Sequence, residues 1–328
     1  MTRLARILAG SALALALASP AAAQSEQGRT PEGALIETSP DLAYAPGSLT
    51  PAQLDASNAD IFTSPGMNVF RRFPRETTAD IVKFYTEALA LRSLNPIQLT
   101  ETQQMILTGV GSMQIKLSAG QQGDRLYDME GGPAGGTGIR FFVLTYPDAD
   151  VVRERFAAAG LAEPVFTRGS DGIEQAVVTD PGGFTILIQI RDGAKDHSDD
   201  GVGVGINTSD LEESRAFYRE FVGLEELPAV ESPILGTTLY PYRHGETTIM
   251  LYNLGDNQHP DNGSAGIQYV VRDAPLAAAR GDHRDLHVQT PLNRLAGFGL
   301  VTVWLSDPDG VTNYFAQVGG RPQQASAQ

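Results

Sequence analysis

Apolar residues follow a helical period in two stretches of the chain, and strand-like stretches surround both. Residues 207–226 place apolar side chains near helical spacing after Ser209, which can cap a helix N-terminus, and they close with a glycine. Residues 75–93 have similar spacing, and both stretches contain a Phe-Tyr pair. Each predicted helix follows a short strand and precedes two or three more, which end at residues 111–119 and 245–253. The pattern therefore predicts one βαβββ unit in each half.

A second type of unit alternates with the first. Residues 138–161 and 266–286 both begin with a strand-like run, continue with a short helical pattern and lead to a D-P-x-G phrase. In that phrase proline presets φ for a turn, and glycine accepts the positive φ that closes it. Each copy, DPGG at 180–183 and DPDG at 307–310, is followed by an apolar, β-prone run. Four units in alternating order predict two similar domains.

The composition between the units sets the expected boundaries. Residues 24–65 are rich in Pro, Ser, Gly, Thr and acids without sustained periodicity, which predicts a flexible N-terminal segment, either a tether or a surface-hugging arm. The break around residues 192–201 is polar and rich in turn formers, as a linker would be. We therefore expect a first domain at 66–192, a linker at 193–200, a second domain at 201–319 and a tail at 320–328.

The first 23 residues have the features of a secretory signal peptide. Arg3 and Arg6 give a positive start, residues 7–18 are apolar but too few to span a bilayer, and three alanines end at Ala23. An uncleaved buried or membrane helix fits less well, because the segment that follows is polar. We expect cleavage near Ala23 and a periplasmic or secreted protein with no membrane span in the mature chain.

Composition narrows the function classes. With 328 residues, 41% of them hydrophobic, the chain can bury two ordinary cores. A net charge of −15 argues against nucleic acids and anionic membrane surfaces as partners, because both require a basic footprint. The absence of cysteine excludes disulfides, thiolate ligands, a cysteine nucleophile and a lipoprotein anchor. The sequence also has no G-x-S-x-G nucleophile elbow.

The order of elements resembles a known superfamily. The Phe-Tyr helix, the GI-x-(F/Y)-x-V opening of the second unit type and the DPDG turn before the final strand are similar to the vicinal oxygen chelate superfamily. This superfamily includes glyoxalases, bleomycin resistance proteins and extradiol dioxygenases. The resemblance covers roughly residues 67–319 and implies an α+β fold in which four βαβββ units form two tandem glyoxalase-like open-barrel domains. It does not choose among the chemistries that this scaffold hosts.

The resemblance also implies metal ligands, namely His, Glu and sometimes Gln, at inward positions of the first and last strands of each unit. The matching positions carry other residues here. On the last strands they are Lys116, Leu187, Met250 and Tyr314, and on the first strands Val69 or Phe70, Gly138, Gly203 and Gly266. None is a carboxylate or a histidine. We therefore expect no metal and no other cofactor.

The histidines offer one alternative metal site. His283 and His287 have the i, i+4 spacing that can place two imidazoles on one helical face. However, Gly281 and the residues after His287 indicate a helix that ends and passes into a strand. The remaining three fall in polar loops or turns: His197, His244 and His259. Solvated surface histidines are the favoured interpretation.

Strand alternation predicts which side chains line the cup of the first domain. The inward residues are Gln114, Lys116 and Ser118, then Thr185, Leu187 and Gln189, and also Arg140, Phe142 and either Arg71 or Arg72. Basic groups in the cup of an acidic protein favour a carboxylate-like or enolate-like ligand, because a buried cation needs an anionic partner. The alternative is that Lys116 pairs with a neighbouring acidic side chain or points to solvent.

The cup of the second domain is expected to be larger and less charged. Its candidate ligand-binding residues are Gly203, Gly205, Asn207, Met250, Tyr252, Gln268 and Tyr314, together with Arg140 from the first domain. Two glycines on one strand leave volume, and the amides and tyrosines supply orientable hydrogen-bond donors. A filled cup, with aromatic side chains packed over the glycines, is the alternative.

Three functions remain open on the sequence alone. The leading hypothesis is an exported protein that binds a small, partly apolar organic molecule without a metal. The second is an enzyme of the same superfamily, a lyase, isomerase or dioxygenase, with Tyr314 and Lys116 as candidate catalytic residues for proton transfer. The third is a structural or interaction module with filled cups. The sequence does not give the oligomeric state or the pairing of the units.

Overall fold

The structure, a computed structural model, describes residues 26–30, 34–64, 66–100, 103–119, 130–195, 200–255 and 265–319. The expected signal peptide at 1–23 and the tail at 320–328 lie outside these ranges, as do His197 and His259. None of the helices within the ranges combines the length and the apolar character that a membrane span requires.

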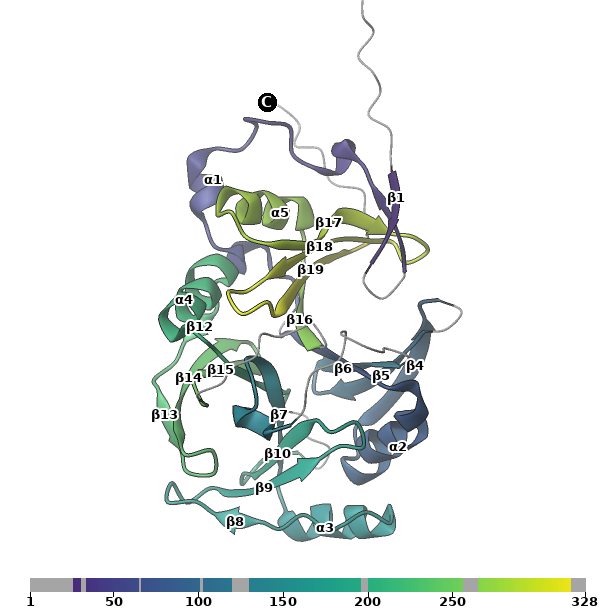
Figure 1. The fold of residues 1–328 in the computed structure, drawn as a ribbon, viewed down its shortest axis with the longest axis vertical. Helices are drawn as coiled ribbons and strands as arrows, with labels where there is room; N and C mark the ends of the chain where they lie inside the picture. Colours follow the sequence, from purple (N-terminus) through teal and green to yellow (C-terminus); the bar gives the residue numbers. More distant parts are fainter. Residues whose placement is uncertain are drawn as a thin grey trace, which may run out of the picture.

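The four expected units are present as strands and helices (Figure 1). The first contains β3 (Asn68–Phe73), α2 (Thr78–Lys83), β4 (Arg92–Gln98), β5 (Gln104–Val110) and β6 (Met113–Ala119). The second contains β7 (Gly138–Tyr146), α3 (Ala149–Ala158), β8 (Thr167–Arg168), β9 (Glu174–Thr179) and β10 (Thr185–Ile190). The third contains β11 (Gly203–Asn207), α4 (Leu211–Ala216), β12 (Glu225–Glu226), β13 (Val230–Ser232), β14 (Thr237–His244) and β15 (Thr247–Tyr252). The fourth contains β16 (Ala265–Val271), α5 (Ala274–His283), β17 (Val288–Leu295), β18 (Leu300–Ser306) and β19 (Thr312–Val318).

These units form two open, curved sheets, which confirms the expected α+β fold (Figure 1). The ten-stranded sheet joins the first unit to the fourth, through antiparallel pairing of β3 with β16. The nine-stranded sheet joins the second unit to the third, through antiparallel pairing of β7 with β11. The pairing that the sequence left open therefore runs between the two halves of the chain, and each sheet takes one unit from each half.

The helices pack against units of their own half of the chain, whereas the strands pair with units of the other half. The helix of the first unit packs on that of the second, with the rings of Phe84 and Phe156 edge to face at 5.7 Å between centroids. In the second half, Phe221 packs edge to face on Phe315 of β19 at 5.8 Å. Helix packing thus ties units within a half, while strand pairing ties them between halves. One continuous apolar cluster with residues from all four units results.

The two D-P-x-G turns occupy equivalent places and use their aspartates in the same way. One carboxylate oxygen of Asp180 accepts backbone hydrogen bonds from Gly182 and Phe184, at 2.9 and 3.0 Å. Its other oxygen accepts from the Tyr85 hydroxyl at 2.9 Å and from Arg71. Each aspartate is almost fully buried. The turn therefore recurs with the Phe-Tyr helix because the two motifs bind each other.

The second copy repeats this bonding. Asp307 accepts from the backbone N–H groups of Asp309 and Val311 at 3.0 and 2.8 Å, and from the Tyr218 hydroxyl at 2.9 Å. Burial, followed by the nearby carboxylate, raises the pKa of the Tyr218 hydroxyl well above its ordinary value. The phenol therefore stays protonated and remains a hydrogen-bond donor.

The helices of the first and third units also end alike. α2 and α4 pass into the π-helical turns η4 (Phe84–Ala88) and η7 (Phe217–Val222), and each turn opens with the Phe-Tyr pair. The N-cap of α4 is Asp210, whose carboxylate accepts a backbone hydrogen bond of 3.0 Å in the first turn. The expectation that Ser209 caps this helix was therefore wrong by one residue. The Ser209 N–H instead donates to the Asp309 carboxylate.

The described part of residues 24–65 is a surface-hugging arm with elements of its own (Figure 1, purple). It contains the hairpin β1 (Glu26–Arg29) and β2 (Leu35–Thr38), the short helices η1 (Pro40–Leu42) and η2 (Asn58–Ile61), and α1 (Pro51–Asp55). β2 extends the ten-stranded sheet by pairing with β17. The buried guanidinium of Arg280 on α5 donates to the carbonyls of Gln53 and Ser57 and to the Asp60 carboxylate, at 2.7 to 2.9 Å. These bonds exclude a free tether for this part of the arm.

Strand pairing between the halves generates a prediction about their independence. We expect residues 24–195 and 200–328, produced separately, to lack a cooperative thermal transition, because each would hold only half of each sheet. Mixing the two pieces should restore the far-ultraviolet spectrum and the transition of the intact chain. A sharp transition in either piece as a monomer would contradict the shared sheets.

Candidate functional site

The concave face of the ten-stranded sheet contains a cavity of about 100 Å³. Because side chains alternate between the two faces of a strand, Phe70 and Arg72 of β3 point to this face beside Lys116 and Ser118 of β6. From the fourth unit, β16 contributes Gln268, and β19 and β18 contribute Tyr314 and Trp304, which pair across the strands. The inward register expected for β6 is therefore correct. The cup, however, is built from the first and fourth units.

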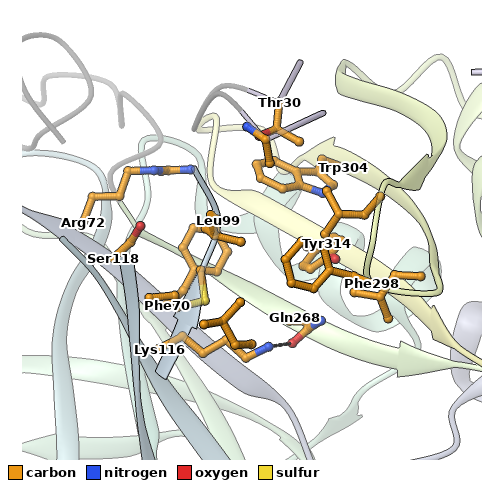
Figure 2. A pocket seen from close by; sticks show the side chains of 15 residues that line it. Thr30, Phe70, Arg72, Leu99, Lys116, Ser118, Gln268, Phe298, Trp304 and Tyr314 are labelled. Atoms are coloured by element: carbon orange, nitrogen blue, oxygen red, sulfur yellow. Dashed lines mark hydrogen bonds between the residues drawn. The ribbon is translucent and has the colours of Figure 1, made fainter. Parts of the chain in front are cut away.

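Lys116 lies at the floor of the cavity with Gln268 (Figure 2). The ammonium group donates to the Gln268 side-chain oxygen, and Asn68 donates to the same oxygen at 3.2 Å. No carboxylate among the described residues contacts Lys116. Burial lowers the pKa of Lys116 to about 8. The alternative that Lys116 pairs with a neighbouring acidic side chain is therefore wrong, because its partner is the neutral amide of Gln268.

Aromatic rings make up much of the cavity wall (Figure 2). The rings of Trp304 and Tyr314 lie 5.1 Å apart between centroids, and Trp304 and Phe70 lie 6.3 Å apart. Phe298, from the turn between β17 and β18, adds a fourth ring, and the Arg72 guanidinium lies 5.2 Å from the centre of the Phe70 ring. An apolar wall with a few polar groups on one side is the usual composition of a small-molecule pocket.

The N-terminal arm contributes to the same cavity. Thr30 and Ala34, which flank the tip of the β1–β2 hairpin, line it opposite the strands of the first unit. The sequence indicated no function for this segment. Its apolar residues follow no helical or strand period, and its position depends on contacts with distant strands. The pairing of Ile36 in β2 with Leu295 in β17 places the hairpin there.

The cup of the nine-stranded sheet is filled. A side chain at Gly205 would meet the Phe141 ring at 2.1 Å from its Cβ, and one at Gly203 would meet Met250 and Val143 at 2.8 and 2.9 Å. The expectation that these glycines leave open volume is therefore wrong. The space is taken by a buried cluster around Phe141, Leu187, Leu239 and Tyr252, with Met250 packed against it.

The polar candidates of this cup bond to neighbouring backbone groups. The Asn207 amide donates to the carbonyls of Gly136 and Leu254, both at 2.8 Å. The Tyr252 hydroxyl donates to the Pro133 carbonyl at 2.7 Å. Arg140 donates to the Gly132 carbonyl at 2.8 and 3.0 Å. These contacts hold the 130–136 segment against the sheet, so the geometry favours a structural role for all three.

One register expectation needs correction, and one open choice is resolved. The pairing of β7 with β11 shifts by one residue near Gly205, so Phe141 instead of Phe142 enters the cup. Phe142 packs on the helix side against Phe184, with ring centroids at 4.8 Å. The open choice between Arg71 and Arg72 is also resolved, because Arg71 bonds to Asp180 in the core and Arg72 lines the cavity.

The structure therefore divides the sequence candidates between two cups. Lys116, Gln268 and Tyr314 meet in the cavity of the ten-stranded sheet. The others belong to the filled cup or the segment beside it: Gly203, Gly205, Asn207, Met250, Tyr252 and Arg140. Phe298 and the arm residues Thr30 and Ala34 were not predicted as ligand-binding residues from the sequence. Only the pairing between halves could have revealed them.

The cavity residues do not fit a divalent metal. The lysine ammonium at the floor has no lone pair to offer while protonated and would repel a cation. Nowhere in the described part of the chain do three or more His, Asp, Glu or Cys side chains gather closely enough to hold an ion.

His283 and His287, which have i, i+4 spacing, do not form a metal site together. His283 bonds to Asp55 at 2.9 Å, while His287 contacts the Ser306 hydroxyl at 3.0 Å. The His244 ring lies tilted against Phe62 at 4.3 Å between ring centroids, and burial lowers the pKa of His244. Each of these imidazoles thus has a separate local partner.

Comparison with known proteins supports the same fold. Residues 202–315 match the family model of the Glyoxalase/Bleomycin resistance protein/Dioxygenase superfamily. Glyoxalase I from Zea mays superposes with a TM-score of 0.61 at 19% identity, covering 76% of this chain and 92% of the maize chain. A single-residue variant of that enzyme gives 0.61 at 18% identity, with coverages of 77% and 94%. No curated protein sequence matches significantly.

The match and the fold together define the class. Residues 202–315 are similar to the Glyoxalase/Bleomycin resistance protein/Dioxygenase superfamily, and the described part of the chain has the glyoxalase-like fold. At this level of identity the maize structures establish the architecture alone, so the activity has to be argued from the cavity.

The filled cup generates a stability prediction. Gly205→Leu should destabilise the protein by more than about 3 kcal/mol, because its side chain would overlap the fully buried Phe141 ring. Chemical denaturation followed by circular dichroism measures this change. A Val177→Leu variant on the exposed face of β9 is the control and should stay within about 0.5 kcal/mol.

A double variant tests the cause. If the overlap with Phe141 is responsible, adding Phe141→Ala to Gly205→Leu should destabilise less than the sum of the two single changes. Strict additivity, or a stable Gly205→Leu variant, would show that the cup has room.

Proposed function

We propose that this protein binds a small, partly apolar organic molecule, without a divalent metal, in the cavity of the ten-stranded sheet. The observation that carries the proposal is the arrangement of Lys116 and Gln268 beneath aromatic walls (Figure 2). Lys116 occupies a last-strand position at which the superfamily resemblance implies a metal ligand. The positive charge at the floor therefore comes from the chain itself.

The size and lining of the cavity support this proposal. A water molecule needs roughly 10–15 Å³ of such space, so about 100 Å³ has room for several waters or a small organic group. Flat rings such as Trp304 and Phe298 bury a large apolar area against a ligand and lose little side-chain entropy. The same lining argues against the hypothesis of a module with both cups filled.

A second candidate, a lyase or isomerase, is favoured by one specific observation. Because burial lowers the pKa of Lys116 to about 8, a fraction of this amine is unprotonated near neutral pH and can accept a proton. Tyr314 supplies a hydroxyl to the same cavity. Turnover that Lys116→Met abolishes while binding persists would favour the enzyme.

The place of action is proposed from the N-terminal sequence. Arg3, Arg6, the apolar run and the alanines ending at Ala23 support export to the periplasm or beyond. In that setting a binding protein would meet its ligand outside the cytoplasm. Comparing the N-terminal residue of the mature protein with the expected Gln24 tests this part of the proposal.

Trp304 makes binding directly observable, because it is the only tryptophan in the sequence and it lines the cavity. We expect phenylacetate or its neutral analogue phenylacetamide to change the fluorescence of Trp304 saturably. Phe298→Ala should weaken this binding about tenfold by removing one wall. Phe166→Ala, outside the cavity, is the matched control. Fluorescence that neither probe changes would contradict the proposal.

Metal independence is a separate expectation. Protein purified without chelator should contain well below one equivalent of zinc, iron or nickel by elemental analysis, because the cavity offers a cation instead of ligand carboxylates. Added EDTA should leave the Tm and the Trp304 titration unchanged. Stoichiometric metal that EDTA removes together with binding would overturn this part.

A further inference from the structure

The charge of the cavity lining is unusual for this chain. The whole sequence carries a net charge of −15, yet none of the described residues that line the cavity is Asp or Glu. The lining does include two basic side chains, Lys116 and Arg72. Within the described part of this acidic chain, the charged side chains that line the cavity are therefore basic.

We infer that the cavity selects a small organic carboxylate, whose charged end contacts Lys116 and whose apolar body lies against the rings of Phe70, Phe298 and Trp304. This inference rests on the proposed function and adds the chemical class of the ligand. An ammonium group in an apolar site without a carboxylate partner is poorly stabilised, and a bound anion supplies the missing charge.

The hydrogen bonding of Lys116 leaves capacity for such a ligand. An ammonium group has three donors, and the described contacts of Lys116 use one of them, toward Gln268. The Gln268 oxygen also accepts from Asn68, which orients the amide and so fixes the direction of the lysine stem. The positive group is therefore held at the floor before a ligand arrives, which lowers the entropic cost of binding.

The walls define the other end of the ligand. The Trp304 and Tyr314 rings lie against each other, and the Phe70 ring lies beside Trp304 on the cavity wall (Figure 2). Such surfaces favour a flat or branched apolar body over a polyhydroxylated one, because sugar-like hydroxyls would lose hydration without replacement partners. A short aromatic or branched aliphatic acid matches both ends.

Charge selection has a pH signature. Burial lowers the pKa of Lys116 to about 8, and only the protonated amine attracts a carboxylate. Affinity should therefore be full below this pH and fall as the pH rises through it. Among the described residues, the other charged or titratable side chains that face the cavity are Arg72 from β3 and Tyr314 from β19. The lining residues from β4, β5, β16, β17 and β18 are uncharged.

The experiment compares phenylacetate with its neutral isostere phenylacetamide, using Trp304 fluorescence of the full mature chain. At pH 7 wild type should bind phenylacetate about tenfold more tightly or better, on the scale of a hydrogen bond to a charged group. This preference should shrink at pH 9.5. Lys116→Met should remove it while changing phenylacetamide affinity by less than about twofold. Lys83→Met, an exposed lysine on α2, is the matched control and should behave as wild type.

The outcomes separate the inference from the proposal beneath it. Equal affinity for the two probes, or a preference that survives in Lys116→Met, would leave the binding function standing and overturn the carboxylate selectivity. If neither probe binds, both fail. Should Lys116→Met not fold, the wild-type pH profile decides alone, because an unchanged preference between pH 7 and pH 9.5 overturns the role of Lys116.

Discussion

A buried hydrogen bond between tyrosine and aspartate holds each half of this chain together. Tyr85 with Asp180 and Tyr218 with Asp307 form it at the same distance, 2.9 Å. Each carboxylate also closes its own D-P-x-G turn, so one side chain fixes the turn, the start of the last strand and the helix of the preceding unit. Without the aspartate carboxylate, several buried hydrogen-bond donors would lose their partner, and each unsatisfied donor would destabilise the fold by about 1–3 kcal/mol. Because the sheets are shared between halves, these bonds and the helix packing link one sheet to the other.

A second constraint decides which cup stays open. Both sheets place a phenylalanine over a glycine of the neighbouring strand, Phe70 over Gly266 and Phe141 over Gly205. In the nine-stranded sheet the last-strand positions that correspond to Lys116 are Leu187 and Met250, and both pack with Phe141 in a closed apolar cluster. In the ten-stranded sheet, Lys116 and Gln268 are polar and would be desolvated by such a cluster without compensation. A lysine at this position therefore disfavours a closed apolar filling of this cup.

A lysine also occupies a position at which the superfamily resemblance implies a metal ligand. Its ammonium group is held by the Gln268 side-chain oxygen, and burial lowers the pKa of Lys116 to about 8. The N-terminal arm adds a wall that the βαβββ units lack, through Thr30 and Ala34. The site thus depends on three parts of the chain that lie far apart in sequence: the arm, the first unit and the fourth unit.

The sequence alone determined the number and order of the units, the two turns, the inward register of β6 and the unusual residue at each expected ligand position. Those features are local, because hydrophobic period and turn chemistry act over a few residues. Tertiary structure decided how the units pair, and hence that Lys116, Gln268 and Tyr314 share a cavity while Gly203 and Gly205 are covered. It also decided the bulge that brings Phe141 inward and the docking of the arm on β17. Repeats of nearly equal pattern can pair within or between halves, so only the summed contacts of the whole chain select one arrangement.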